Sequence, residues 1–297
     1  MTTFDAIFVG LIQGLTEFIP VSSSGHLAVA KFFVPIHDID LNYIVLLHFG
    51  TVLAIFAALY KDIWVLIRDF CKGEKYALYF ALLILISMVP AAIVGFTLDD
   101  VLERIFCEEG LKIGKMPLEP YRLIGLAFIA CAYWVLTPAD KILKARNSLA
   151  PEEKEEQEKT LKGLEEMTWK DALWIGVAQA VAVIPGLSRS GSTIYAGLLC
   201  KLKSDAAARF SFLMSIPVIL GAALKDCLSS EFRSRLAVSW HNGDGTAIVQ
   251  VIGILVAAIS GYVAIKLLLK MVNKYNFHPF VVYLWIIPSL SISGSSD

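Results

Sequence analysis

The chain has 297 residues, of which 57% are hydrophobic and 18% are charged, and its formal net charge is -1. Soluble domains carry about 25% charged residues, so this composition excludes an ordinary water-soluble protein and predicts an integral membrane protein. The near-zero net charge excludes the strongly basic surface with which proteins bind nucleic acid. Residues 1–5 lack the basic region of a signal peptide, so we expect internal apolar segments to direct membrane insertion.

Six apolar stretches approach the roughly 20 residues that a helix needs to cross a bilayer. They are residues 43–60, 76–98, 123–136, 210–224, 246–265 and 280–292. Lysine and arginine gather after the first, third and fifth stretches and before the fourth. Because positively charged segments stay in the cytoplasm, this distribution predicts six transmembrane helices, both termini outside, and an outer loop over residues 99–119.

Two further apolar segments, residues 4–34 and 172–199, are interrupted by proline, glycine and serine. Each is a poor continuous span and is better explained as a helix, a polar turn and a second helix that returns to the same side of the membrane. The two segments resemble each other, since Gln13 lies 166 residues before Gln179 in matching surroundings. The same spacing recurs near the far end of each half, which predicts an internal repeat.

The repeat divides the chain into residues 1–139 and 171–297, each with one re-entrant helical hairpin and three transmembrane helices. An odd number of crossings inverts the second half, and inverted repeats of this kind aim broken helices at an anion near the bilayer midplane. We therefore expect an all-α, polytopic membrane protein with two inverted-topology repeats. Residues 140–170 form a charged cytoplasmic linker, and the acidic run 152–159 predicts a solvated helix.

The first interruption carries polar groups inside an apolar segment. Glu17 is expensive at membrane depth, which favours a functional role over a structural one. Gln13 lies one helical turn earlier, and the oxygen atoms of both residues suit a hard cation such as Mg²⁺ or Ca²⁺. His26 follows Ser23 by three residues, so its imidazole could take the serine proton or protonate a leaving group. Further candidates for phosphate binding at a helix N-terminus are Ser22, Ser24 and Gly25. The alternative is that these serines only cap the helix.

The second interruption contains Arg189, which is always charged and carries a planar fork of donors. At membrane depth it needs an anionic partner. Glu17 is one candidate, in a purely structural ion pair, and a phosphate held by two hydrogen bonds is the other. The neighbouring candidates for phosphate binding are Ser188, Ser190, Gly191 and Thr193. Together the two interruptions predict a phosphate site that faces a lipid environment.

Two motifs carry a family resemblance. Gly-Leu-Thr-Glu-Phe-Ile-Pro-Val-Ser-Ser-Ser-Gly-His at 14–26 and Pro-Gly-Leu-Ser-Arg-Ser-Gly-Ser-Thr at 185–193 resemble the signatures of bacterial undecaprenyl-diphosphate phosphatases of the bacitracin-resistance type. The resemblance covers nearly the whole chain. It implies a hydrolase of the bacterial inner membrane that converts the lipid diphosphate to undecaprenyl phosphate and inorganic phosphate. This reaction recycles the cell-wall lipid carrier and confers bacitracin resistance. The resemblance also implies a divalent cation and a site that faces the periplasmic side.

Position by position, the resemblance assigns Glu17 to an essential acidic motif and assigns Ser23 and His26 to catalysis. The second motif then supplies the phosphate-binding positions Ser188, Arg189 and Thr193. Two positions depart from the family pattern. Gln13 stands where the family often has a second acid, and Leu284 stands where it often has arginine.

Two mechanisms and two rival functions stay open at the level of sequence. Ser23 attacks the terminal phosphorus with help from His26, or His26 activates water and Ser23 is a ligand. In both cases Arg189 and a cation held by Glu17 neutralise the diphosphate. The rivals are a transporter or flippase for an anion or lipid phosphate, which inverted repeats also suit, and a non-catalytic lipid-binding protein. The expected partners are a polyprenyl diphosphate and membrane lipids, with a homodimer as a further candidate.

Overall fold

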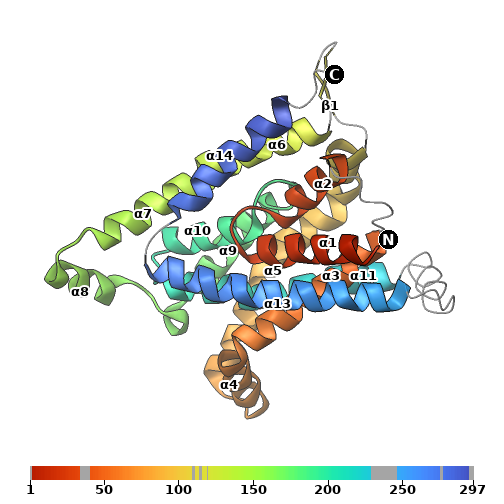
Figure 1. The fold of residues 1–297 in the computed structure, drawn as a ribbon. Coiled ribbons are helices and arrows are strands. Elements are labelled where there is room, and N and C mark those ends of the chain that lie inside the picture. The colour runs from red at the N-terminus through yellow and green to blue at the C-terminus, as the bar shows by residue number, and fades with distance from the viewer. Residues whose placement is uncertain are drawn as a thin grey trace.

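The computed structural model describes residues 2–33, 41–108, 111–113, 116–118, 120–228, 246–274 and 277–293. Helices dominate this part of the chain (Figure 1). The α-helices of the first half are α1 (Thr3–Phe18), α2 (Ser23–Phe33), α3 (Leu41–Ala58), α4 (Tyr60–Cys71), α5 (Lys75–Glu103), α6 (Pro120–Ala130) and α7 (Thr137–Asn147). Those that follow are α8 (Pro151–Thr160), α9 (Trp169–Val181), α10 (Arg189–Leu199), α11 (Ser204–Leu228), α13 (Thr246–Asn273) and α14 (His278–Ser293). The short helical turns are η1 (Arg104–Glu108), η2 (Cys131–Leu136) and η3 (Leu164–Glu166).

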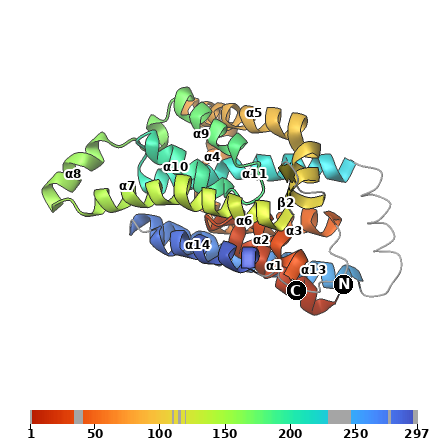
Figure 2. The ribbon, with the colours of Figure 1, turned by 90° about the horizontal axis from the view of Figure 1, so that it is seen from above.

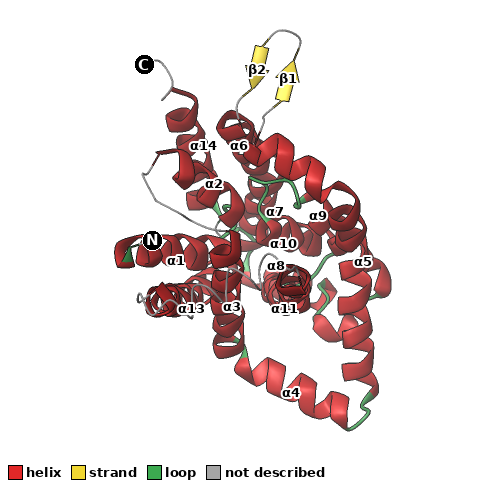
Figure 3. Ribbon diagram, turned by 90° about the vertical axis from the view of Figure 1, so that its right-hand side faces the viewer, coloured by secondary structure: helices red, strands yellow, loops and turns green. Residues whose placement is uncertain are grey.

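The prediction of a helical protein is confirmed, apart from one small hairpin. Strands β1 (Leu111–Ile113) and β2 (Met116–Leu118) pair antiparallel and project beyond the helices (Figure 3). They lie within residues 99–119, the predicted outer loop. Helix α5 continues to Glu103 and η1 follows it directly, so helical structure extends further into this segment than the sequence indicated.

Four helical stretches are long and apolar enough to cross a membrane, namely Lys75–Leu98, Arg122–Asn147, Ser204–Leu224 and Ala247–Asn273. They correspond to the second, third, fourth and fifth predicted spans. Helices α3 and α4 together form a further candidate, but they are bent by 84° at their junction. Helix α14 has 16 residues, fewer than the roughly 20 of a straight span. The described residues therefore contain four or five candidate spans, and the sixth stays a prediction.

The third candidate span runs past its predicted end. Helices α6, η2 and α7 form one rod (Figure 2), so the boundary predicted at residue 140 falls inside a helix. Two of the charged residues in this stretch are buried and have partners from other parts of the chain. The Asp140 carboxylate accepts a hydrogen bond from the Phe277 amide at 2.9 Å, and Arg146 donates to the Leu202 carbonyl at 3.1 Å. The acidic run 152–159 lies in α8, which buries none of its residues, as predicted.

The two helical hairpins, α1–α2 and α9–α10, begin in the same way. The Thr2 hydroxyl accepts from the Asp5 amide at 3.2 Å, and the Asp5 carboxylate accepts from the Thr2 amide at 2.7 Å. Thr168 and Asp171, each 166 residues later, repeat both bonds at 3.4 and 2.8 Å. Such a reciprocal capping box satisfies two amides that the first helical turn would otherwise leave free. The sequence repeat is therefore also a structural repeat at the start of each hairpin.

The first helix of each hairpin packs against a long helix from the other half of the chain. Helix α1 lies along α13, and α9 lies along α5 (Figures 1 and 2). A Cβ atom on Gly10 would lie 2.5 Å from the Gly253 carbonyl oxygen, and one on Gly176 would lie 2.5 Å from that of Ser87. Both partners are again 166 residues apart. Small residues allow membrane helices to approach closely enough for backbone contact, so these glycines fix where each hairpin sits.

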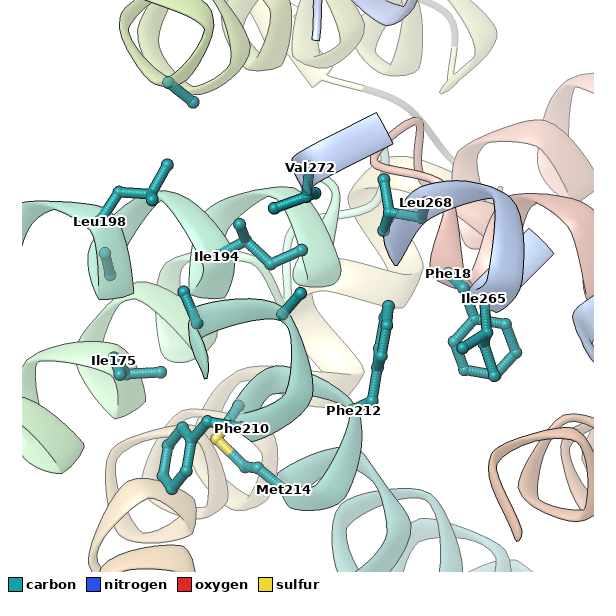
Figure 4. Close-up of a cluster of buried hydrophobic side chains, with 14 of the residues drawn as sticks. Phe18, Ile175, Ile194, Leu198, Phe210, Phe212, Met214, Ile265, Leu268 and Val272 are labelled. Carbon is teal, nitrogen blue, oxygen red and sulfur yellow. The ribbon is translucent and has the colours of Figure 1, made fainter. Parts of the chain in front are cut away.

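A buried aromatic cluster holds the end of α1. Phe18 packs edge-on against Phe212 of α11, with ring centroids 5.6 Å apart, and Ile265 of α13 lies beside them (Figure 4). On the other side of α11, Phe210 packs edge-on against Phe80 of α5 at 5.8 Å. Phe18 directly follows Glu17 in the chain. Its packing therefore fixes the position of the Glu17 carboxylate.

Candidate active site

The turns of the two hairpins are in contact. Ser22 has a φ of 70° and Gly186 a φ of 96°, and this left-handed backbone reverses the chain within a few residues. A Cβ atom on Gly25 would lie 3.0 Å from the Gly186 Cα, and one on Gly191 would lie 3.1 Å from the Pro20 Cβ. The two glycines of the sequence motifs thus lie where each turn passes closest to the other.

Glu17 lies at the centre of this junction and is 8% exposed. Its Oε2 atom accepts hydrogen bonds from Gln13 Nε2 at 3.0 Å and from the Ser23 hydroxyl at 2.5 Å. Its Oε1 atom accepts from Arg189 Nη2 at 2.5 Å, across 172 positions of sequence. The structure therefore brings together one carboxylate, one hydroxyl, one amide and one guanidinium from both hairpins. The ion pair anticipated as one alternative for Arg189 is present in this structure.

His26 has different partners from those that the sequence suggested. Its Nδ1 atom lies 2.7 Å from the Ser22 carbonyl oxygen, and its Nε2 atom lies 2.8 Å from the Tyr283 hydroxyl. The expected approach of His26 to Ser23 is not among the hydrogen bonds of the described residues, because Ser23 donates to Glu17 instead. A carbonyl can only accept, so Nδ1 carries a proton. In the neutral ring Nε2 is then the acceptor, and Tyr283 donates to it.

Tyr283 is a residue of this site that the sequence reasoning did not single out. Its ring stacks on the His26 ring with centroids 5.6 Å apart and planes inclined by 7°. Phe128 of α6 lies on the imidazole as well, at 5.1 Å. Tyr283 belongs to α14, whose start is held by the bond from the Phe277 amide to Asp140. The family pattern pointed only to the neighbouring Leu284, and it gave no role to the tyrosine.

Some serines of the predicted phosphate-binding set are helix caps. The Ser188 hydroxyl accepts from the Gly191 amide at 3.1 Å and so caps α10. The Ser22 hydroxyl accepts from the Gly25 amide at 3.4 Å in the corresponding turn of α2, and it also lies 3.3 Å from the exposed Ser24 hydroxyl. The capping alternative therefore describes Ser22 and Ser188 in this structure.

The remaining members of that set point elsewhere. Ser190 lies 3.1 Å from the Ser188 hydroxyl and donates to the Ile19 carbonyl at 3.5 Å, which links the two turns. Thr193 is 1% exposed and its hydroxyl lies 2.6 Å from that of Ser211 on α11. Thr193 thus ties α10 to its neighbour rather than lining the junction.

The junction supplies some, but not all, of the oxygen ligands that a hard cation needs. The Gln13 Oε1 atom is buried and has no hydrogen-bond partner among the described residues. The nitrogen of the same side chain donates to Glu17, whose carboxylate would have to exchange one of its hydrogen bonds for a bond to the cation. No group of three or more His, Cys, Asp or Glu residues gathers in the described part of the chain. A magnesium or calcium ion here would therefore need substrate oxygens to complete its ligands.

The arrangement is suited to binding and transferring a phosphoryl group. Arg189 is the first residue of α10, and Ser23 is the first residue of α2. Two helix N-termini, each with the partial positive charge of a helix start, therefore begin at the junction beside the guanidinium. A phosphate bound here would compete with Glu17 for Arg189. The Glu17 carboxylate would then be free to accept the proton of the hydroxyl that it already contacts.

Comparison with known proteins shows the family of this chain. The family described as bacitracin resistance protein BacA matches residues 6–290. A protein named undecaprenyl-diphosphatase from Halothermothrix orenii is 36% identical over 97% of this chain and 96% of its own length. Proteins of the same name from Parabacteroides distasonis and Bacteroides fragilis are each 36% identical, over 95% and 98% of this chain and 94% and 98% of their own lengths. With its apolar helices and a match over almost its whole length, this chain belongs to the BacA family of multi-pass membrane proteins.

Proposed function

We propose that this protein is a membrane phosphatase that hydrolyses undecaprenyl diphosphate to undecaprenyl phosphate and inorganic phosphate. Water is added across the P–O–P anhydride, so the terminal phosphate leaves and the lipid keeps the other. The names of the relatives support the substrate. The observation that carries the chemistry is the cluster of Glu17, Ser23 and Arg189 where two apolar hairpins meet. The relatives' names favour this reaction over transport.

Arg189 binds the terminal phosphate in this proposal. Phosphoryl transfer is catalysed chiefly by positioning and by stabilising negative charge. A guanidinium can donate two parallel hydrogen bonds to phosphate oxygens, and the low dielectric of a membrane site strengthens them. The ion pair with Glu17 keeps Arg189 satisfied until the substrate arrives. The amides at the start of α2 and α10 add further donors on the same side.

Ser23 is the nucleophile and Glu17 is the base that takes its proton. The support for this assignment is the 2.5 Å hydrogen bond from Ser23 to Glu17, in place of the earlier hypothesis that His26 is the base. The Ser23 oxygen forms a bond to the terminal phosphorus as the bond to undecaprenyl phosphate breaks. Water then attacks the phosphoserine, which releases inorganic phosphate and restores the hydroxyl. In its doubly protonated form, in which Nε2 also carries a proton, His26 would donate that proton to the departing lipid phosphate.

A divalent cation fits this site with Gln13 Oε1 and the Glu17 carboxylate as its protein ligands. When bound, Mg²⁺ or Ca²⁺ would neutralise part of the charge on the diphosphate. The unpartnered, buried Gln13 oxygen is the observation that supports this assignment.

In the membrane, we propose six transmembrane helices in two inverted halves, with the hairpins re-entrant and the site open to the periplasmic side of the inner membrane. The capping boxes and the glycine contacts both recur after 166 residues, which supports two equivalent halves. The first helix of each hairpin also packs against a long helix of the other half. On this arrangement the charged helix α8 lies in the cytoplasm.

The deciding experiment is release of inorganic phosphate from undecaprenyl diphosphate by purified protein in detergent, with and without EDTA. We expect release that needs a divalent cation and falls about 10³-fold or more in Arg189→Ala. Arg68→Ala is the matched control, because Arg68 lies on α4 and pairs with Asp69 at the surface. No release by folded protein, with lipid or anion flux across sealed vesicles, would replace this proposal with a carrier.

Ser23→Ala separates the two mechanisms. A covalent phosphoserine should be trapped on the wild-type protein by rapid acid quenching, and Ser23→Ala should lose about 10³-fold in turnover. Ser188→Ala is the control, because this cap should affect stability by about 1 kcal/mol and turnover much less. If Ser23→Ala keeps substantial turnover and no phosphoserine forms, water is the nucleophile and Ser23 only positions Glu17.

A further inference from the structure

A groove of about 380 Å³ lies between α5, the end of α9 and the second half of α11. Its walls are apolar, with Met88, Phe96 and small residues such as Gly95 and Gly221. The two polar residues that line it are Gln179 and Arg189. The size falls within the roughly 300–1,000 Å³ of small-molecule sites in proteins. Because Arg189 belongs to the junction described above, the groove leads from the outer surface of the helices to the candidate active site.

Two glycines keep this groove open although helix packing does not require them. Gly95 lies inside α5 and Gly221 inside α11, and glycine is disfavoured in helix interiors. A Cβ atom added at either position would meet nothing within 4 Å. By contrast, a Cβ on Gly10 or Gly176 would meet the backbone of the neighbouring helix. The space beside Gly95 and Gly221 is therefore left for something other than a protein side chain.

Gln179 marks the inner part of the groove as a place for a polar ligand. Its side chain is 2% exposed, and neither its oxygen nor its nitrogen has a hydrogen-bond partner among the described residues. Buried polar groups in proteins nearly always have partners, so this amide indicates a group that binds there. The Gln179 amide nitrogen and the Arg189 guanidinium are both donors, which suits phosphate oxygens.

We propose that this groove holds the first isoprene units of the polyprenyl diphosphate, and that Gln179 donates to the phosphate that stays on the lipid. The inference rests on the proposed function and names the path of its substrate. An isoprenoid chain matches the apolar walls, and its diphosphate matches the donors at the inner end. An ordinary phospholipid would bring its headgroup to the membrane surface instead. Phe96, which is 78% exposed, lies at the mouth where the chain passes into the bilayer.

Filling the groove tests this proposal. Gly95→Leu and Gly221→Leu place a side chain in empty space, so both should fold, and each should raise KM for undecaprenyl diphosphate about tenfold or more with kcat within about twofold. Ala57→Leu, at an exposed position of α3 outside the groove, is the matched control and should leave both constants unchanged. Gln179→Met removes the amide at nearly constant volume and should raise KM by a similar factor. Folded leucine variants with unchanged KM would overturn the proposal.

A second measurement needs neither turnover nor mutation. A polyprenyl diphosphate with a photoreactive group near the diphosphate should label wild-type protein within 88–96 of α5 and 217–222 of α11, as mapped by mass spectrometry. Excess unlabelled undecaprenyl diphosphate should suppress the labelling. Labelling confined to other helices would place the chain elsewhere even if phosphate release is observed. Labelling in the groove without phosphate release would support the binding site and contradict the enzymatic proposal alone.

Discussion

The hairpins α1–α2 and α9–α10 share a backbone design and carry different chemistry. Each starts with a threonine–aspartate capping box and meets a partner helix through a glycine at the equivalent position. Yet the first turn supplies Glu17 and Ser23, and the second supplies Arg189. Two identical turns in contact would bring like charges together at low dielectric, which is strongly unfavourable. A repeated scaffold can therefore form one site only if its halves diverge in charge.

The equivalent glutamines show the same divergence. Gln13 donates to Glu17 at 3.0 Å, whereas neither side-chain atom of Gln179 has a partner among the described residues. The surroundings differ as well. A Cβ on Gly261 would lie 3.0 Å from the Ala54 Cβ, but one on Gly95, 166 residues earlier, would meet nothing within 4 Å. At this position one half is closed by helix packing and the other keeps the groove in which we propose that the substrate binds.

Breaking the ion pair between Glu17 and Arg189 should have the largest effect on stability and on phosphate release. Glu17→Gln leaves the partly buried Arg189 guanidinium without a carboxylate, which should destabilise the protein by about 1–3 kcal/mol and lower phosphate release about 10³-fold. Adding Arg189→Met removes the second charge and should restore most of the stability but none of the activity. Thermal unfolding in detergent and the phosphate assay measure the two effects separately.

A double variant as unstable as Glu17→Gln would contradict this explanation, because the unpaired charge would then not be the cause. The result would indicate that Glu17 holds the first turn through Ser23 and Gln13 instead. The difference between the two hairpins would then lie in the local structure at the end of α1 and not in their opposite charges.

A smaller effect on phosphate release is expected at Tyr283, which lies on α14 and belongs to neither hairpin. Tyr283→Phe keeps the stacked ring on His26 but removes the hydroxyl that bonds to Nε2 at 2.8 Å. We expect a fall of about tenfold in kcat and a changed pH dependence, with stability lowered by only about 1 kcal/mol. Tyr133→Phe, at an exposed ring on η2, is the control. A fall in stability with an unchanged pH–rate profile would assign Tyr283 a structural role.

The sequence predicted those features of the site that depend on residue type and spacing. Intramembrane Glu17 and Arg189 stood out because charge is rare in apolar segments, and the repeat at 166 residues placed them on corresponding turns. The acidic run of α8 and most of the long apolar helices were also predicted from composition. Such signals are local, or they repeat along the chain, so a single sequence contains them.

What the sequence did not predict depends on tertiary partners. The Ser23 hydroxyl has Glu17 and His26 within reach in the chain, and only the folded turn selects Glu17. Tyr283 lies 257 residues from His26, so no spacing indicated the contact. In the sequence, Asp140 marks the start of a polar segment. In the structure its carboxylate accepts a hydrogen bond from the Phe277 amide, and Asp140 stays buried within a continuing helix.

The smallest expected effect tests whether the two hairpins begin equivalently. Thr2→Ala and Thr168→Ala each remove the side chain that caps the first helical turn, at α1 and at α9. Each should lower the free energy of unfolding by about 1 kcal/mol, and phosphate release should change little. Urea or thermal unfolding in the same detergent gives both values. Unequal losses of several-fold would show that the capping boxes, though alike in geometry, are not equivalent in energy.

The second capping box should also depend on pH. Burial raises the pKa of the Asp171 carboxyl, but Lys162 and Thr168 outweigh burial and hold this pKa below its usual value. The group therefore stabilises the fold at pH values above the ordinary aspartate pKa of about 3.9, and this contribution is lost as pH falls through the lowered pKa. Lys162 Nζ lies 2.6 Å from both carboxylate oxygens.

Asp171→Asn should lower stability by about 2 kcal/mol at pH 7 and by progressively less below pH 4, as measured by unfolding across that range. Lys162→Met, which spares the capping box, should cost less at pH 7, and a loss as large as that of Asp171→Asn would assign the effect to the ion pair alone.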